Sequence, residues 1–273
     1  MLTYNGNVVK LDHFPDGTLL MKCDVDPEDD HFISWVFESN EELVALVYLV
    51  SHIRQHSDPG CSITLFMGYI PNARQDRVKN PEDVFTLKYF AEILNGLKLD
   101  RVLVSDPHSS VSEALIDRIE VLGADDRIRD LYKRISKKSS SPVIMFYPDE
   151  GAMKRYSGAV SAPYAFGIKK RNWETGEIVG LDVSGETERI KGSTVLIADD
   201  ICSRGGTFTH SARKLKELGA EKIYLYVTHC EKTILEGTVL TDGLIEKVFT
   251  TLSLPPVENE RIEVLARKQI PCC

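Results

Sequence analysis

Short apolar runs alternate with amphipathic segments along most of the chain, and polar residues follow the apolar runs. Segments with apolar residues at helical spacing include Leu43–Ile53, Val84–Leu94 and Phe208–Leu218. Strands that alternate with helices imply parallel sheets, so the pattern predicts an α/β fold with helices flanking the sheets. The runs that predict strands are Leu19–Asp24, Ser62–Ile70, Arg101–Ser105, Val143–Tyr147, Ala165–Ile168, Val195–Ala198 and Lys222–Thr228.

A polar, Pro-terminated segment near the middle of the chain, Lys137–Pro142, is the best candidate for a linker. Several strand–helix units precede it and several follow it. We therefore expect two α/β domains of similar size, residues 1–138 and 139–273. In open parallel sheets ligands bind at the carboxyl ends of the strands, so the polar residues after each strand are the candidates for function.

The most informative stretch is Thr194–Thr207, with the sequence TVLIADDICSRGGT. An apolar strand ends in Asp199 and Asp200, the small loop Ser203–Thr207 follows, and a helix with Gly219 at its C-cap position follows the loop. Backbone N–H groups of such a loop and of a helix N-terminus form an anion site. Two adjacent carboxylates can hold a sugar diol or a metal ion. The combination predicts a site for a sugar phosphate.

Composition limits the class of protein. The chain has 273 residues, 42% hydrophobic and 27% charged, which is ordinary for a globular protein. Its formal charge of −8 argues against general binding to nucleic acid or to a membrane surface. No secretion signal or long apolar run is present, and none of the six cysteines forms a C-x-x-C pair. We therefore expect a cytoplasmic protein with reduced thiols.

A second polar cluster follows the strand that ends near Ile70. It reads ARQDR, with Arg74, Gln75, Asp76 and Arg77 in one loop. Two guanidinium groups can each bind phosphate oxygens through paired hydrogen bonds, although a loop of surface salt bridges has the same composition. The cluster is therefore a second candidate phosphate site.

These elements, in their order along the chain, resemble the ribose-phosphate pyrophosphokinase family. Thr194–Thr207 is similar to the phosphoribosyl diphosphate loop that this family shares with type I phosphoribosyltransferases, and ARQDR is similar to its ATP-binding segment. The resemblance implies two tandem phosphoribosyltransferase-like domains, an N-terminal ATP-binding one and a C-terminal one with the sugar-phosphate loop. Further similar segments are Phe14–Gly17, Asp106–His108, Tyr147–Arg155, Lys169–Arg171 and Thr250–Leu254.

The resemblance also implies a role for each matched residue. Lys169 and Arg171 would be the catalytic pair, with Lys170 in place of Lys169 if the alignment shifts by one. His108 and Asp149 would hold magnesium, a hard cation suited to phosphates and carboxylates. The ATP-binding set would be Phe14, Asp16, Arg74, Gln75, Asp76, Arg77 and His108. The sugar-phosphate set would be Asp149, Asp199, Asp200, Ser203, Arg204, Gly205, Gly206 and Thr207.

The implied reaction moves the β,γ-diphosphate of ATP to the anomeric hydroxyl of ribose 5-phosphate, in a homo-oligomer of at least two subunits. Three departures from the family pattern are Thr18 for glutamate, Glu150 for a small residue, and Ser203-Arg204 for Asp-Thr. Arg204 adds a cation to the phosphate loop, which suggests an alternative acceptor with a diphosphate, ADP-ribose, in NAD salvage.

Two further alternatives are a homologue without catalytic activity and an enzyme formed by the second half of the chain alone. A non-catalytic homologue that regulates true synthetases is disfavoured because Lys169, Arg171 and His108 are retained. A phosphoribosyltransferase built on the second half alone is disfavoured by the ATP-type segment Ala73–Arg77.

Overall fold

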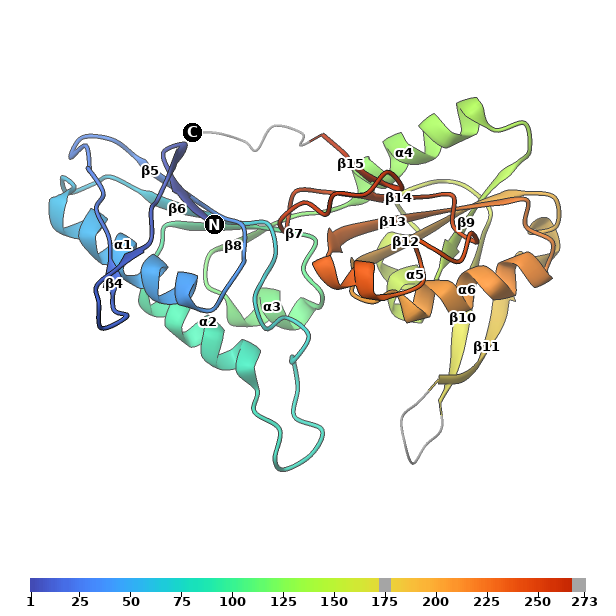
Figure 1. The fold of residues 1–273 in the computed structure, drawn as a ribbon, viewed down its shortest axis with the longest axis horizontal. Coiled ribbons are helices and arrows are strands. Elements are labelled where there is room, and N and C mark those ends of the chain that lie inside the picture. The colour runs from blue at the N-terminus through green and yellow to red at the C-terminus, as the bar shows by residue number, and fades with distance from the viewer. Residues whose placement is uncertain (172–177, 267–273) are drawn as a thin grey trace. The chain divides into compact units, whose positions relative to one another are not determined.

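The structure is a computed structural model that describes residues 1–171 and 178–266. The chain forms two compact units (Figure 1). The described part of the first comprises Met1–Leu122 together with Ser253–Pro255, and that of the second comprises residues 123–171, 178–252 and 256–266. No helix within these described ranges is long and apolar enough to cross a bilayer.

The first unit is a six-stranded sheet in the order β2-β1-β5-β6-β7-β8. Strands β5 to β8 are parallel, and β1 and β2 add antiparallel edge strands. The strands are β1 (Leu2–Tyr4), β2 (Asn7–Val8), β5 (His31–Trp35), β6 (Ile63–Met67), β7 (Arg101–Ser105) and β8 (Ile119–Leu122), and a short hairpin pairs β3 (Asp12–His13) with β4 (Leu19–Leu20). The helices are α1 (Glu41–His56), α2 (Thr86–Gly96) and α3 (Ser110–Leu115).

The apolar spacing that predicts the first helix also determines which face it buries. Leu46, Leu49, Val50 and Ile53 of α1 are each at most 1% exposed and pack into the core of this unit. Residues three and four apart lie on the same face of a helix, so one stripe faces the sheet while Tyr48 remains exposed.

The second unit is a seven-stranded sheet in the order β11-β10-β9-β12-β13-β14-β15. All of its strands are parallel except β11, which pairs antiparallel with β10. The strands are β9 (Val143–Tyr147), β10 (Tyr164–Arg171), β11 (Ile178–Gly185), β12 (Thr194–Cys202), β13 (Lys222–Cys230), β14 (Lys247–Thr250) and β15 (Ile262–Val264). The helices are α4 (Asp125–Lys138), α5 (Glu150–Tyr156) and α6 (Gly206–Glu217), with 3₁₀ turns η1 (Thr187–Arg189) and η2 (Lys232–Glu236).

The predicted fold class is confirmed: each unit has a mainly parallel sheet flanked by helices. Strands β7 and β9 begin and end where the apolar runs predict. Gly219, expected as a C-cap, has a φ of 90° just after α6, in the left-handed region that glycine adopts without strain.

Several strands differ in extent from the sequence-based expectation. The strand expected over Leu19–Asp24 is limited to Leu19–Leu20. Strand β10 continues beyond Ile168 to Arg171 because its hairpin partner β11 supplies hydrogen-bond partners. Strand β14 ends at Thr250, so most of the family-like segment Thr250–Leu254 lies beyond the strand, and Ser253–Pro255 already belong to the first unit.

The units also divide at a different place from the expected boundary at residue 138. The division lies between Leu122 and Gly123, because α4 packs on the sheet of the second unit. Ile128, Leu131 and Ile135 of α4 are buried in one cluster with residues of β9 and β12. The polar segment after α4 therefore connects a helix to the next strand of the same unit.

Candidate active site

The sequence suggested that the strand ends at the acidic pair. In the structure Asp199 and Asp200 lie within β12, which continues to Cys202. The strand continues because Asp199 and Ile201 pair with Val227 and His229 of β13. Asp200 is only 4% exposed, and its backbone N–H donates to Oδ1 of Asp199 at 2.9 Å. Two ionisable groups are thus fixed on a rigid strand rather than on a loose turn.

A third carboxylate approaches this pair from the neighbouring strand. Asp149 follows β9, caps α5 and accepts a hydrogen bond from Ala152 N at 3.0 Å. Burial, and then the charges of Asp200 and Asp149, raise the pKa of Asp199 well above its usual value. Arg155 Nη1 lies 3.4 Å from Asp200 Oδ2 and offsets part of this charge. The remaining negative charge suits a divalent cation or the hydroxyl groups of a sugar.

The glycine-rich loop between β12 and α6 depends on one glycine in particular. Gly205 has a φ of 76° at the start of α6, and a β-carbon there would also collide with Val239. Gly206, one residue later, has open space around its Cα. The Phe208 and Thr209 N–H groups donate to Gly205 O, whereas the Gly206 and Thr207 N–H groups have no carbonyl four residues earlier within the helix and can face an anion.

Residues 231–239, which we call the bracing segment, hold this loop from the other side. Ser203 Oγ lies 3.0 Å from Thr233 Oγ1, and the Glu231 N–H donates to Cys202 O at 2.8 Å. A β-carbon at Gly237 would collide with the carbonyl oxygen of Arg204. None of its residues belongs to a recognisable motif, so no local pattern in the sequence signals this segment.

Arg204 does not contribute its full charge to the loop. Its guanidinium pairs with Glu236 of η2 through Nε at 3.0 Å and Nη2 at 2.9 Å, and its side chain is 73% exposed. The extra cation that the sequence places in the phosphate loop is therefore paired with a carboxylate of the bracing segment.

The expected catalytic residues Lys169, Lys170 and Arg171 end strand β10, which lies beside β9. Their backbones pair with β11 in a hairpin, and the register shifts between Lys170 and Arg171. Figure 1 shows this hairpin as two long adjoining strands. The side chains of Lys169, Lys170 and Arg171 lie outside the described residues, so the expected roles of these residues stay predictions.

In the first unit, the ARQDR segment follows β6 and ends beside α2. Burial acts to raise the pKa of Asp76, but hydrogen bonds and nearby positive charge, mainly from Arg77, lower it below its usual value. Arg77 binds this carboxylate through Nε at 2.9 Å and Nη2 at 3.3 Å. Gln75 Oε1 accepts a hydrogen bond from Thr86 Oγ1 at 2.8 Å and so fixes the loop to the start of α2. Arg74 is exposed.

His108 is half-buried after β7 and is close enough to Asp76 to influence the pKa of that carboxyl, so the structure brings these two predicted residues together. Asp106, just before it, has a φ of 44°, an uncommon backbone conformation for this residue type. The Phe14–Gly17 turn joins β3 to β4, with Phe14 exposed and Asp16 accepting hydrogen bonds from Thr18 N at 3.0 Å and Oγ1 at 2.7 Å.

The acidic residues of the second unit form part of a ligand set for a divalent cation. Among residues 1–171 and 178–266, no three His, Cys, Asp or Glu side chains form a complete metal-binding group. Magnesium, however, commonly uses one or two protein carboxylates and takes its other ligands from phosphates and water. The carboxylates that raise the pKa of Asp199 supply this partial set, so the site fits magnesium that arrives with a phosphorylated substrate.

A parallel sheet, two aspartates within β12, a glycine loop and a helix N-terminus give the second unit a phosphoribosyltransferase-like fold. Residues 128–249 match the family model described as "Phosphoribosyl transferase domain". Over almost the whole chain, the resemblance is to ribose-phosphate pyrophosphokinases.

The regions of similarity cover most of this chain and most of each similar protein. The chain is 26% identical to ribose-phosphate pyrophosphokinase of Hyphomonas neptunium, over 94% of this chain and 88% of the relative. It is 26% identical to the enzyme of that name from Sulfurisphaera tokodaii, over 91% and 86%. The crystal structure of phosphoribosylpyrophosphate synthetase from Mycobacterium smegmatis superposes with a TM-score of 0.77 at 21% identity, covering 94% of this chain and 85% of that one. The predicted family resemblance is confirmed, and that crystal structure shows the same fold.

Proposed function

We propose that this chain is a ribose-phosphate diphosphokinase, which transfers the β,γ-diphosphate of ATP to the 1-hydroxyl of ribose 5-phosphate. The products are phosphoribosyl diphosphate and AMP. The observation that carries the proposal is the sugar-phosphate site of the second unit, where Asp149, Asp199 and Asp200 lie close to a glycine loop and a helix N-terminus. Relatives with this enzyme name match nearly the whole length of the chain.

At the acceptor site, side-chain carboxylates and backbone N–H groups bind different parts of the sugar phosphate. Asp199 and Asp200 accept hydrogen bonds from the 2- and 3-hydroxyl groups of ribose. The N–H groups of Ser203–Thr207 bind the 5-phosphate, because the helix N-terminus favours negative charge. The bracing segment keeps the loop in this conformation before substrate arrives, which lowers the entropy lost on binding.

In the ATP half, the ARQDR segment, His108 and the Phe14–Gly17 turn hold the nucleotide. The 1-hydroxyl oxygen attacks the β-phosphorus, the bond from that phosphorus to the α-phosphate oxygen breaks, and AMP leaves. Lys169 or Lys170, with Arg171, stabilises the charge on the transferred diphosphate. The sequence implies Asp149 and His108 as the residues that would hold magnesium, and the ion would neutralise phosphate charge there.

The main alternative acceptor is ADP-ribose, which carries a diphosphate where ribose 5-phosphate carries one phosphate. The case for it rests on Arg204 as an additional cation. The pairing of Arg204 with Glu236 supports the smaller acceptor, because the added charge is already compensated. A regulatory homologue without activity is the alternative from another class.

One assay separates these functions. The full chain is incubated with ATP and magnesium, and AMP release is measured with ribose 5-phosphate, with ADP-ribose or with no acceptor. We expect AMP with ribose 5-phosphate at least ~10-fold faster than with ADP-ribose, the discrimination that about 1.4 kcal/mol provides. Release only with ADP-ribose would overturn the choice of acceptor, and release with neither would favour the regulatory homologue.

The proposal includes a cytoplasmic location and self-association into at least a dimer, both of which the sequence analysis expected. The four described cysteines are free thiols, as a reducing compartment requires. Sedimentation velocity of the full chain tests the association: a single species with the mass of one 30.7 kDa chain would contradict it.

A further inference from the structure

A cavity lies at the edge of the second sheet opposite the candidate active site. It has a volume of about 210 Å³. We call it the amino-edge cavity, because Thr194, Lys222 and Lys247, which begin β12, β13 and β14, line it. The far end of β12 reaches the sugar-phosphate loop, about 26 Å away at ~3.3 Å per residue. The cavity is therefore separate from the acceptor site, although the same strand extends to both.

The lining of this cavity is strongly cationic, while the chain as a whole carries a charge of −8. Arg134 and Lys138 come from α4, and Lys222 and Lys247 from the strand ends. Glu263 of β15 is the only acidic side chain that lines it among the described residues. Four cations against one carboxylate leave a formal charge of +3.

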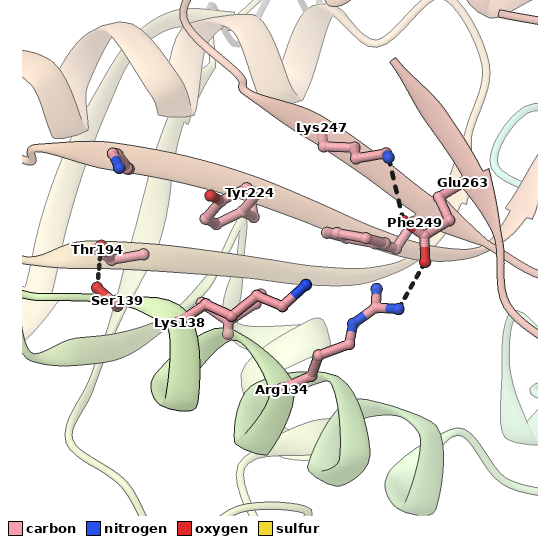
Figure 2. A pocket seen from close by; sticks show the side chains of 10 residues that line it. Arg134, Lys138, Ser139, Thr194, Tyr224, Lys247, Phe249 and Glu263 are labelled. Atoms are coloured by element: carbon pink, nitrogen blue, oxygen red, sulfur yellow. Dashed lines mark hydrogen bonds and ion pairs between the residues drawn. The ribbon is translucent and has the colours of Figure 1, made fainter. Parts of the chain in front are cut away.

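Glu263 is fully occupied as the partner of two of these cations. Arg134 Nη1 lies 2.6 Å from its Oε1 and Lys247 Nζ lies 3.1 Å from its Oε2, as Figure 2 shows. Burial acts to raise the pKa of Glu263, but the hydrogen bonds and charges of Arg134 and Lys247 outweigh burial and lower it. The carboxylate therefore stays ionised and holds both cations in place.

Arg134 is held in position but retains an unused donor. Its guanidinium carbon lies 4.8 Å from the centre of the Phe249 ring, so the aromatic face supports the group. Its Nη2 is buried and has no hydrogen-bond acceptor among the described residues. A buried guanidinium nitrogen without an acceptor is costly, and an anionic oxygen is the acceptor that suits it best.

Lys138 and Lys222 are exposed at this cavity, and neither pairs with a carboxylate of the described residues. On the same wall, Thr194 Oγ1 lies 2.9 Å from the Ser139 hydroxyl, a pair drawn in Figure 2. The cavity thus offers a positioned guanidinium, two ammonium groups and hydroxyl groups. That set of donors matches a phosphoryl group with several anionic oxygens.

We propose that the amino-edge cavity is a second anion site, which binds a phosphoryl or diphosphate group between Arg134, Lys138 and Lys222. The volume is below the ~300–1,000 Å³ typical of sites for drug-sized ligands, so the cavity suits a free anion or the phosphate end of a larger molecule. The site does not depend on the acceptor or the reaction proposed above.

The test uses equilibrium dialysis of the full chain against radiolabelled inorganic phosphate, inorganic diphosphate or AMP. The double variant Lys138→Glu/Lys222→Glu should lose one class of bound anion, or bind it at least ~10-fold more weakly, because two charge-assisted contacts become repulsive. The control is Lys133→Glu, which makes the same charge change as Lys138→Glu alone, on the same helix α4 and at a residue that does not line the cavity.

The three ligands distinguish the sources of the phosphoryl group. Preferential loss of phosphate or diphosphate binding in the double variant identifies a free anion, and preferential loss of AMP binding identifies the phosphate of a nucleotide. Equal binding of all three ligands by the double variant and by Lys133→Glu overturns the proposal. Because both lysines are exposed, an unchanged melting temperature checks that each variant is folded.

Discussion

The two edges of the second sheet have opposite charge arrangements, although we propose an anion site at each. At the carboxyl edge, Asp149, Asp199 and Asp200 crowd together, and the proposed phosphate site relies on backbone N–H groups. At the amino edge, side-chain cations dominate, and Arg134 and Lys247 share one carboxylate. The same strands, β12 and β13, carry residues of both edges.

The difference follows from what each edge of the sheet supplies. The start of α6 already provides donors and a positive dipole end at the carboxyl edge, so acidic side chains can be used there for hydroxyl groups and a cation. No helix begins among the residues that line the amino-edge cavity, so charge must come from side chains. The carboxyl edge is thus suited to a substrate with both hydroxyl and phosphate groups, and the amino edge to phosphate alone.

The largest expected effect of any substitution is at the carboxyl edge. Lys169→Ala or Arg171→Ala should each lower kcat for AMP formation by about 10²–10³-fold or more, because the proposed mechanism would lose a cation that stabilises charge developing in the transition state. Single-turnover rates with ribose 5-phosphate measure the effect. Lys133→Ala on α4, which lines neither site, is the control and should change kcat less than twofold.

A parallel variant decides between the two lysines of β10. If Lys170→Ala lowers kcat by the larger factor and Lys169→Ala does not, the assignment moves by one residue. Near-normal rates in Lys169→Ala, Lys170→Ala and Arg171→Ala would remove this strand from the proposed mechanism.

The next largest effect concerns the geometry of the glycine loop. Gly205→Ala should destabilise the protein by ~1–3 kcal/mol and raise KM for ribose 5-phosphate, because the residue has a positive φ and a β-carbon would collide with Val239. Gly206→Ala is the matched control. Open space surrounds it, so its free energy of unfolding should be unchanged or higher by up to ~1 kcal/mol. Equal destabilisation by both substitutions in urea unfolding would contradict this structure of the loop.

A smaller effect is expected at Asp199, where a substitution should raise stability and lower activity. The pKa of Asp199 is higher in the folded state than in the unfolded state. The free energy of unfolding therefore falls as the pH rises through the folded pKa, because the buried carboxyl must ionise there. Below the unfolded pKa the carboxyl is neutral in both states and this loss is absent. Asp199→Asn should therefore raise the melting temperature by about 2–4 °C at pH 8, which corresponds to ~1 kcal/mol, while lowering activity. The gain should shrink towards pH 4. Melting curves in chelator test this, and a gain independent of pH would show that crowded charge is not its cause.

Regular patterns made much of this molecule predictable from its sequence. Strands β7 and β9 are compact apolar runs buried on both faces, and Gly219 occupies a C-cap position that demands a positive φ. The positions of Asp199 and Asp200 beside a glycine loop also followed from local order along the chain. Such features depend on neighbouring residues, and therefore a single sequence reveals them.

Features that depend on distant partners were not predictable. Strand β10 extends to Arg171 because β11 pairs with it, and α4 joins the second unit because of its packing on β9. The pairing of Arg204 with Glu236 joins residues 32 positions apart, and no local pattern signals it. The amino-edge cavity was missed for the same reason, since its cations come from separate elements.

The smallest expected effect is at Arg204, and it sharpens the contrast between backbone and side-chain recognition. An exposed ion pair contributes only about 0–1 kcal/mol, and Glu236 already neutralises this guanidinium. Arg204→Ala should therefore change KM for ribose 5-phosphate less than ~3-fold and leave the preference over ADP-ribose unchanged. Glu236→Gln, which releases the cation, should instead improve use of ADP-ribose relative to ribose 5-phosphate. If Arg204→Ala alone abolishes acceptor binding, the carboxyl edge binds phosphate through a side-chain cation, as we propose for the amino edge.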